Sequence, residues 1–319
     1  MKIISFNHKG MDKVGVIFGK EIIDLGFALK TYYSVNFKKE ILIYNNITHY
    51  LVKQLVTIEI LNDLIKWLKK SGLFSGFLIN SDDKIKFHPP IKPGKIIALG
   101  RNYVAHAKEQ NAPVPKEPIL FEKANSSVIG HNDNIVYKKF LLKIPRRGIL
   151  NEVKDLNIKN ARVDHEVELA IVIGKRASNI KKKDAFKYVF GYTILNDITA
   201  RNLQAADFKM SYPWFRSKSI DTFCPIGPWI VTCDDIKNPH NLNLSLKVNG
   251  KIKQSDNTKN MLFKIPYLIE YISMYLTLEP GDIISTGTPE GISPIYPGDI
   301  IEAKIDKIGI LKNKVISEK

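Results

Sequence analysis

The chain has 319 residues, and its 48 lysines and arginines against 32 aspartates and glutamates give a formal net charge of +16 at pH 7. Its hydrophobic content of 44% and charged content of 25% are those of an ordinary globular protein. No apolar run approaches the roughly 20 residues that span a bilayer, and the apolar stretch near the N-terminus is too short for a signal peptide. We therefore expect a cytoplasmic protein with no membrane partner, and the two cysteines give no disulfide framework.

The excess positive charge raises the alternative of a nucleic-acid-binding protein. However, the lysines are scattered along the chain, and the densest cluster, at residues 181–183, lies in a predicted surface loop. No helix-turn-helix, zinc-finger or aromatic-and-basic RNA motif stands out. We expect a solvated lysine-rich surface that attracts anionic carboxylate substrates and binds no nucleic acid, whereas steep salt-dependent binding to DNA or RNA would favour the alternative.

The first 90 residues have the pattern of a small α+β domain. Residues 3–6, 14–18 and 21–25 are predicted to be short strands joined by Gly and Lys turns. Within residues 55–70, apolar side chains recur at helical spacing and predict an amphipathic helix. Prolines at positions 89, 90 and 93 then mark a boundary. We therefore expect two domains, at residues 1–90 and 91–319.

A predicted strand over residues 95–99 leads into a short helix that carries His106 and Glu109. Residues three apart share a face of a helix. A carboxylate beside an imidazole fixes the imidazole tautomer and raises its basicity, which suits a general base. From these residues alone, a surface His–Glu pair of little consequence is the favoured interpretation.

Two carboxylates open a predicted buried strand over residues 169–173. Glu166 and Glu168 share a face because side chains alternate along a strand. Two such like charges need a shared proton, a cationic partner or a divalent metal, unless both face water on an edge strand. Asp197 ends a second predicted strand, at residues 192–195, where we expect the chain to turn into a helix that Asp197 or Thr199 could cap. Three oxygen ligands are typical of Mg²⁺ or Mn²⁺, and no zinc-like Cys/His spacing occurs.

The remaining elements are predicted from local patterns. Residues 137–160 form a Lys-, Arg- and Asn-rich stretch that we interpret as an inserted surface segment. Residues 229–232 are a predicted strand, and residues 242–254 a hairpin with an Asn-Gly turn. Residues 266–278 are a predicted helix that starts at a proline. A Gly- and Pro-rich turn over residues 286–291 and closing strands complete the chain.

Two motifs resemble the fumarylacetoacetate hydrolase family closely: Asp-His-Glu-Val-Glu-Leu-Ala at 164–170, and Asn-Asp-Ile-Thr-Ala-Arg-Asn-Leu-Gln at 196–204. The resemblance covers residues 94–316 and includes blocks around residues 100–110, 118–131, 211–232 and 278–294. It implies an α+β fold that is mainly β, with a catalytic domain built as a roll of mixed β-sheets. It also implies a homodimer, and the small N-terminal α+β domain precedes the catalytic domain.

The resemblance implies a set of site residues. Glu166, Glu168 and Asp197 are implied to hold a divalent metal, Mg²⁺ or Mn²⁺, with Ca²⁺ also open. The implied catalytic residues are His106, which Glu109 orients to activate water, and Lys218, which stabilises developing negative charge. The implied substrate-binding residues are Arg101, Tyr103, Lys123, Gln204 and Thr288; of these, Lys123 would face the ligand's carboxylate, and Thr288 would bind a carboxylate through its hydroxyl and backbone N–H groups.

The implied activity is hydrolysis of a C–C bond in a small carboxylate substrate, of the acylpyruvate or fumarylpyruvate (2-oxo or 1,3-dioxo) type. In this scheme the pyruvate enolate leaves, stabilised by the metal and Lys218. The same kind of site also serves isomerases, decarboxylases and lyases, such as hydroxyheptadienedioate isomerase or ureidoglycolate lyase, and the sequence does not separate them. A catalytically inactive homologue would require the loss of a ligand, and none is lost.

Overall fold

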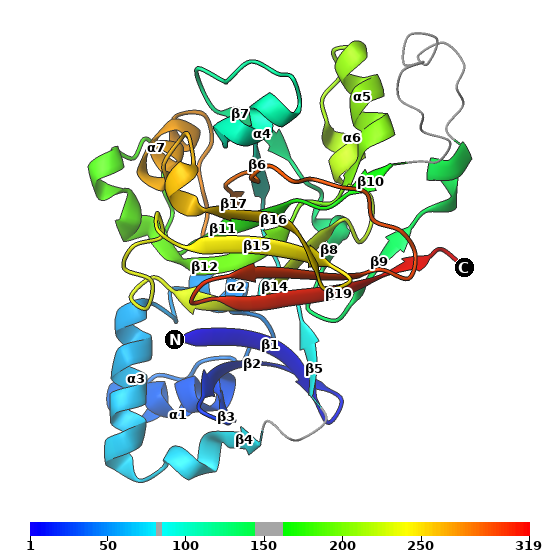
Figure 1. The fold of residues 1–319 in the computed structure, drawn as a ribbon. Coiled ribbons are helices and arrows are strands. Elements are labelled where there is room, and N and C mark those ends of the chain that lie inside the picture. Colours follow the sequence, from blue (N-terminus) through cyan, green and yellow to red (C-terminus); the bar gives the residue numbers. More distant parts are fainter. Residues whose placement is uncertain (81–84, 144–161) are drawn as a thin grey trace.

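The computed structural model describes residues 1–80, 85–143 and 162–319 as an α+β chain made mainly of strands (Figure 1). The N-terminal region contains β1 (Lys2–His8), β2 (Met11–Phe18), β3 (Glu21–Asp24), α1 (Leu25–Phe37), α2 (Ile47–Val52), α3 (Ile58–Ser71), the 3-10 helix η1 (Phe74–Phe77), β4 (Leu78–Asn80) and β5 (Ile85–His88). The helix predicted over residues 55–70 is confirmed as α3. It begins at Ile58 because the Thr57 side chain caps it by accepting a hydrogen bond from the Ile60 N–H.

Helix α1 was not predicted from the sequence. The strand predicted over residues 21–25 ends at Asp24, whose side chain accepts a hydrogen bond from the Phe27 N–H and caps the helix that follows. Leu25, Ala28 and Leu29 are buried along one face of this helix. These three residues have helical spacing in the sequence. However, Ile22 and Ile23 just before them fit a strand pattern, so the change from strand to helix at Asp24 is not apparent from the sequence.

The rest of the described chain contains the elements from β6 to β19. Its first half comprises β6 (Ile96–Gly100), α4 (Val104–Glu109), β7 (Ile119–Glu122), η2 (Asn125–Ser127), β8 (Val128–Ile129), β9 (Asn134–Tyr137), η3 (Lys139–Lys143), β10 (Val163–Asp164), β11 (Val167–Ile173), η4 (Lys182–Tyr188) and β12 (Val189–Asn196). Its second half comprises β13 (Thr199–Ala200), α5 (Arg201–Lys209), α6 (Phe215–Lys218), β14 (Cys224–Thr232), β15 (Asn243–Val248), β16 (Lys251–Asn257), η5 (Thr258–Asn260), α7 (Ile265–Tyr275), β17 (Ile283–Ser285), β18 (Ile300–Ile305) and β19 (Gly309–Ser317). Of the predicted inserted segment, residues 144–160 lie outside the described part.

Two large sheets organise the described residues. The first has twelve strands, with the order β4-β3-β2-β1-β14-β12-β11-β17-β6-β7, β5 pairing with β1 and β8 with β14. The second has five strands in the order β16-β15-β18-β19-β9, and it lies across β11, β12 and β14 in Figure 1. Strand β11 lies between β12 and β17, so the strand that follows Glu166 is central in its sheet.

The N-terminal region shares its sheet with the rest of the chain. Strand β1 pairs antiparallel with β14, with Lys2 opposite Val231 and Ile3 opposite Ile230. One apolar cluster, which includes Ile3 and Leu61 of the N-terminal region, also contains Ala170 of β11. The boundary at residue 90 therefore remains a prediction, and the N-terminal strands extend the sheet that carries the site.

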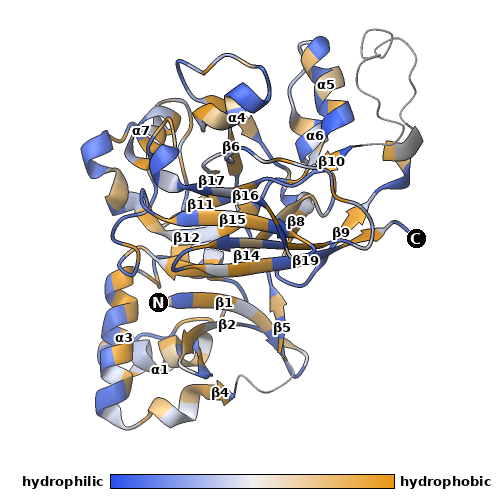
Figure 2. Ribbon diagram, viewed as in Figure 1, coloured by the Kyte–Doolittle hydropathy of each residue, from blue (hydrophilic) through white to orange (hydrophobic). Residues whose placement is uncertain are grey.

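Hydrophobic residues are frequent along the strands, and hydrophilic residues are frequent in the loops (Figure 2). The largest apolar cluster fills the space between the two sheets and includes Leu169, Ile171, Leu246 and Ile301. The predicted Asn-Gly hairpin is confirmed: Asn249 and Gly250 have φ values of 50° and 77° between β15 and β16. No helix of the described residues is long and apolar enough to cross a membrane.

Candidate metal and acid–base site

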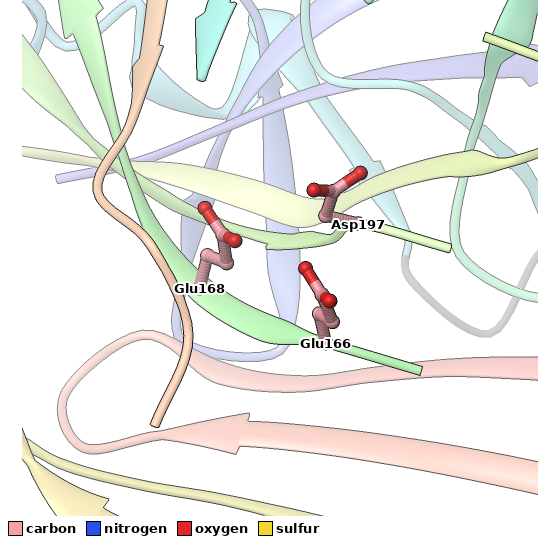
Figure 3. A group of neighbouring side chains, drawn as sticks. All are labelled: Glu166, Glu168 and Asp197. Atoms are coloured by element: carbon pink, nitrogen blue, oxygen red, sulfur yellow. The ribbon is translucent and has the colours of Figure 1, made fainter. Parts of the chain in front are cut away.

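Three carboxylates converge at the start of β11. Donor oxygens of Glu166, Glu168 and Asp197 all lie within 4.8 Å of one another, and the three side chains point toward a common region (Figure 3). Glu166 is 4% exposed, Glu168 1% and Asp197 0%. The alternative that both glutamates face water on an edge strand is therefore wrong.

Strand pairing brings these carboxylates together. Val167 of β11 lies opposite Asn196 of β12, so the residue that follows β12 meets the residue that precedes β11. The Asp197 N–H donates to the Glu166 carbonyl over 2.8 Å, and the Asn196 side chain accepts from the Glu166 N–H over 2.9 Å. Asp197 does not cap a helix, because the two-residue strand β13 separates it from α5 and Ala200 is the N-cap residue.

Three cations, the buried Lys218 and Lys123 and the partly buried Arg201, bind carboxylates of the triad. Lys218 Nζ lies 2.8 Å from Glu166 Oε2 and also donates to Asp197. Lys123 Nζ lies 2.7 Å from the other oxygen of Asp197, and Arg201 donates to Glu166. Burial alone would raise the pKa of Glu166, but the charges of Lys218 and Arg201 outweigh burial and hold that pKa well below its usual range.

Glu168 has the opposite environment. Burial, together with repulsion from Asp197 and Glu166, raises the pKa of Glu168 to about 8. Its Oε2 atom accepts hydrogen bonds from Ser285 Oγ over 2.6 Å and from the Gly287 N–H over 2.8 Å. These two bonds orient the carboxylate but supply no full positive charge. A cation at this position would remove the repulsion that disfavours its ionised form.

The triad therefore fits a divalent metal. All its donors are carboxylate oxygens from rigid strand ends, which is the ligand type that Mg²⁺ and Mn²⁺ prefer. The hydrogen-bond partners of Glu168 are the neutral Ser285 and Gly287, so it is the carboxylate of the triad that a bound cation would stabilise most. Glu166, Glu168 and Asp197 are the residues that would hold the ion.

The predicted His–Glu pair also forms. His106 Nδ1 lies 3.0 Å from Glu109 Oε2, and the other oxygen of Glu109 accepts a hydrogen bond from the Gly291 N–H over 2.9 Å. Burial alone would raise the pKa of Glu109, but the hydrogen bonds from His106 and Gly291 hold it below its usual value. An ionised carboxylate can only accept, so His106 carries its proton on Nδ1 and presents Nε2 as the basic nitrogen.

His106 and two members of the triad, Glu166 and Glu168, line one pocket of roughly 290 Å³, including its open mouth, whereas Asp197 and Glu109 lie outside its lining. Its lining includes seven of the predicted site residues: Arg101, His106, Glu166, Glu168, Gln204, Lys218 and Thr288. It also includes residues that the sequence reasoning did not single out: Leu99, Gly100, Gln110, Phe121, Arg201 and Trp214. Of these, Arg201 had a signal in the sequence. It is a charged residue of the motif at 196–204 and follows Asp197 by four positions.

Arg101 supplies a positive charge at the pocket wall. Its backbone has a φ of 56°, and its guanidinium lies over the rings of Phe208 and Trp214. Its Nε donates to Gln110 Oε1 over 3.2 Å, and among the described residues no carboxylate pairs with it. Burial without an anionic partner lowers the pKa of Arg101. An anionic group of a ligand would be a favourable partner for this guanidinium.

Three predicted substrate-binding residues have contacts that differ from those expected. Lys123 is fully buried on Asp197 and the Lys218 carbonyl, away from the pocket lining. Tyr103 is 1% exposed and also outside the lining, and its hydroxyl has no hydrogen-bond partner in the described residues. The Thr288 hydroxyl donates to the Val167 carbonyl over 2.9 Å, so its proton is already used within the protein. Their roles in binding remain predictions.

Comparison with known proteins places this site in context. The sequence profile described as Fumarylacetoacetate (FAA) hydrolase C-terminal matches residues 95–316. The chain belongs to this family. The resemblance noted in the sequence is therefore confirmed, and the α+β fold, mainly β, is that of its solved members.

Relatives in this family carry different activities. An uncharacterized protein of Pyrococcus abyssi is 51% identical over 228 residues, which are 72% of this chain and 92% of the relative. The mitochondrial oxaloacetate tautomerase FAHD2A of Bos taurus is 41% identical over 235 residues, 72% of this chain and 68% of the relative. The structure of maleylpyruvate hydrolase from Sphingobium sp. SYK-6, in complex with manganese (II) ion and pyruvate, matches with a TM-score of 0.72 and 29% identity over 100% of both chains.

Proposed function

We propose that the protein is a divalent-metal-dependent enzyme that interconverts the keto and enol forms of a short 2-oxo dicarboxylate of the oxaloacetate type. One observation carries this proposal: His106, which Glu109 holds by a hydrogen bond, lines the same pocket as Glu166 and Glu168 of the triad and as Arg101, whose guanidinium has no carboxylate partner among the described residues. A base, a site for a chelated 2-oxo acid and a counter-charge for a second carboxylate then surround one ligand. The 41% identity to an oxaloacetate tautomerase supports the same assignment.

The chain's own residues would perform the proton transfer. His106 Nε2 takes a proton from C3 of the keto form, and Glu109 stabilises the resulting imidazolium through the Nδ1 hydrogen bond. The imidazolium then returns this proton to the 2-oxo oxygen, which gives the enol and restores the neutral base. Lys218, which also lines the pocket, would stabilise the negative charge that develops on the 2-oxo oxygen. Arg101 binds the distal carboxylate and holds C3 near the base. A divalent ion on the triad, when bound, would polarise the 2-oxo and carboxylate oxygens.

The experiment follows enol absorbance and C3 deuterium exchange of oxaloacetate with purified protein, with and without added Mg²⁺ or Mn²⁺. We expect metal-dependent acceleration of both, without release of pyruvate. An exchange rate equal to that of the metal-containing buffer alone would refute the tautomerase assignment.

A second candidate is hydrolysis of a C–C bond in an acylpyruvate, because the same base can activate water. The specific observation that favours it is the match to maleylpyruvate hydrolase along the whole chain, N-terminal region included. The same preparation would be offered acetylpyruvate and fumarylpyruvate, and pyruvate would be followed. Metal-dependent pyruvate release from either, with no effect on oxaloacetate, would move the assignment to hydrolase.

A further inference from the structure

A chain of hydrogen bonds links the pocket arginine to the proposed base. Arg101 Nε donates to Gln110 Oε1 over 3.2 Å, and Gln110 Nε2 lies 3.1 Å from His106 Nε2. The orientation of the Gln110 carboxamide is fixed by this arrangement, because an arginine can only donate and its partner must be the carbonyl oxygen. The amide NH₂ of Gln110 therefore points at His106.

The tautomer of His106 sets the direction of that last contact. Since Nδ1 carries the proton that Glu109 accepts, Nε2 offers a lone pair, and the Gln110 amide donates to it. Gln110 thus occupies the nitrogen that must receive a proton in the proposed reaction. It is the residue immediately after α4, whose backbone N–H donates to the His106 carbonyl, so it is held next to the base.

We propose that Gln110 is a positioning residue that covers the base until a distal carboxylate engages Arg101. This inference rests on the proposed function, because it uses Arg101 as the anion-binding group and His106 as the base. A ligand carboxylate is a stronger acceptor for a guanidinium than a neutral amide oxygen. When it takes the Nε of Arg101, the Gln110 carbonyl loses its partner, the carboxamide is free to rotate, and His106 Nε2 opens to the substrate.

The consequence is selection between substrates with one and two carboxylates. A 2-oxo dicarboxylate such as oxaloacetate engages Arg101 and uncovers the base. A 2-oxo monocarboxylate such as pyruvate has no group for Arg101 and meets a covered base. The pocket would therefore discriminate against the smaller ligand by the missing carboxylate and not by size alone.

The test compares C3 deuterium exchange of pyruvate and oxaloacetate in the wild type and in Gln110→Met, which keeps the length of the side chain but cannot donate. We expect kcat/KM for pyruvate exchange to rise about tenfold, the effect of one hydrogen bond of about 1.4 kcal/mol, so that the ratio of oxaloacetate to pyruvate exchange falls. A gain of this kind does not arise from damage to the fold. Unchanged or lower pyruvate exchange in Gln110→Met would overturn the proposal.

Gln204→Met is the matched control, because Gln204 also lines the pocket but bonds to Arg201 and not to His106. It should give no gain in pyruvate exchange, and an equal gain would overturn the specific role of Gln110. Diethylpyrocarbonate, which acylates an unprotonated imidazole nitrogen, supplies a readout that needs no turnover. His106, followed by mass spectrometry, should react faster in Gln110→Met than in the wild type. If the wild type exchanges neither substrate, the proposed function fails, and the rate of His106 modification still decides whether Gln110 covers the base.

Discussion

Lys218 Nζ lies 2.8 Å from Glu166 Oε2, and the same ammonium donates to Asp197, so a lysine stands between two of the three carboxylates. Asp197 has both oxygens engaged, because Lys123 holds the other one. Burial alone would lower the pKa of Lys218, but Asp197 and Glu166 outweigh it and hold that pKa above its usual value. A divalent ion on this triad must therefore coexist with a nearby fixed positive charge.

Replacing Lys218 by Met should strengthen metal binding while lowering kcat. The substitution deletes a positive charge that repels the ion, and we expect the Kd for Mn²⁺, measured by calorimetry, to fall about tenfold. The charge that faces the developing enolate is lost at the same time, so kcat should fall about a hundredfold. Lys95→Met is the control, because Lys95 pairs with buried Asp282 outside the pocket. Weaker Mn²⁺ binding in Lys218→Met would contradict this account.

Glu168→Gln should abolish metal-dependent turnover and leave the fold intact. The amide is isosteric and can still accept from Ser285 and Gly287, so the local structure is retained. Without the carboxylate, repulsion by Asp197 and Glu166 disappears, and the metal-free variant should be at least as stable as the wild type at pH 8. Chemical denaturation gives the stability and calorimetry the Mn²⁺ affinity. Metal-dependent activity of Glu168→Gln at the wild-type level would refute the assignment of Glu168 as a ligand.

Metal binding should become stronger as the pH rises toward 8. The pKa of Glu168 is raised to about 8, so at pH 7 the carboxyl is mostly protonated in the folded protein and must lose its proton to bind an ion. Calorimetry at pH 7 in two buffers of different ionisation enthalpy should show release of about one proton for each Mn²⁺ bound. At pH 9.5 the release should vanish. Glu168→Gln should release none at either pH, and an equal release from that variant would assign the proton to another group.

The raised pKa of Glu168 also makes the stability of the metal-free protein depend on pH. A glutamate whose pKa is raised on folding from 4.5 to about 8 binds more protons in the folded than in the unfolded state between these values. Its contribution to the free energy of unfolding is complete below pH 4.5 and is lost as the pH rises through 8. Between pH 6 and 9, chemical denaturation without metal should therefore show a decline that Glu168→Gln lacks.

The triad could be predicted from the sequence because its signal is local. Glu166 and Glu168 stand two positions apart before an apolar, β-branched run, and the strand period of two then fixes their common face. The position of Asp197 beside the two glutamates depends on the pairing of β11 with β12, which neither strand reveals by itself. Its role as a third ligand was therefore predicted from the resemblance of the motif at 196–204 to the family. The Asn249-Gly250 turn was equally local, since its two residues tolerate the positive φ that the hairpin requires.

The partners of individual side chains could not be predicted in this way. Lys123 is one lysine among many in the sequence, and only the packing of the loop after β7 against Asp197 reveals that it is fully buried. The Thr288 hydroxyl was expected to face a ligand, but its proton is directed at Val167 because the turn lies against β11. Such contacts depend on residues more than 70 positions apart, and no local pattern encodes them.

Substitution of the base should separate chemistry from binding. We expect His106→Asn to lower kcat for enolisation about a hundredfold or more, because it removes the proton acceptor. Glu109→Gln should cost about tenfold, because a neutral amide stabilises the imidazolium less than a carboxylate does. Neither side chain contacts the triad, so the Kd for Mn²⁺ should stay within about threefold of the wild-type value, less than 0.7 kcal/mol. Steady-state kinetics and calorimetry give the two quantities.

The chain offers a matched control for this pair. His88 Nε2 lies 3.0 Å from Asp12 Oδ1 in the N-terminal region, which is another His–carboxylate contact but one outside the pocket. His88→Asn should leave kcat and KM at the wild-type level. If His106→Asn and His88→Asn have the same kcat, His106 takes no part in the reaction. A large loss of Mn²⁺ affinity in His106→Asn would instead mean that the imidazole supports the metal site and does not act as the base.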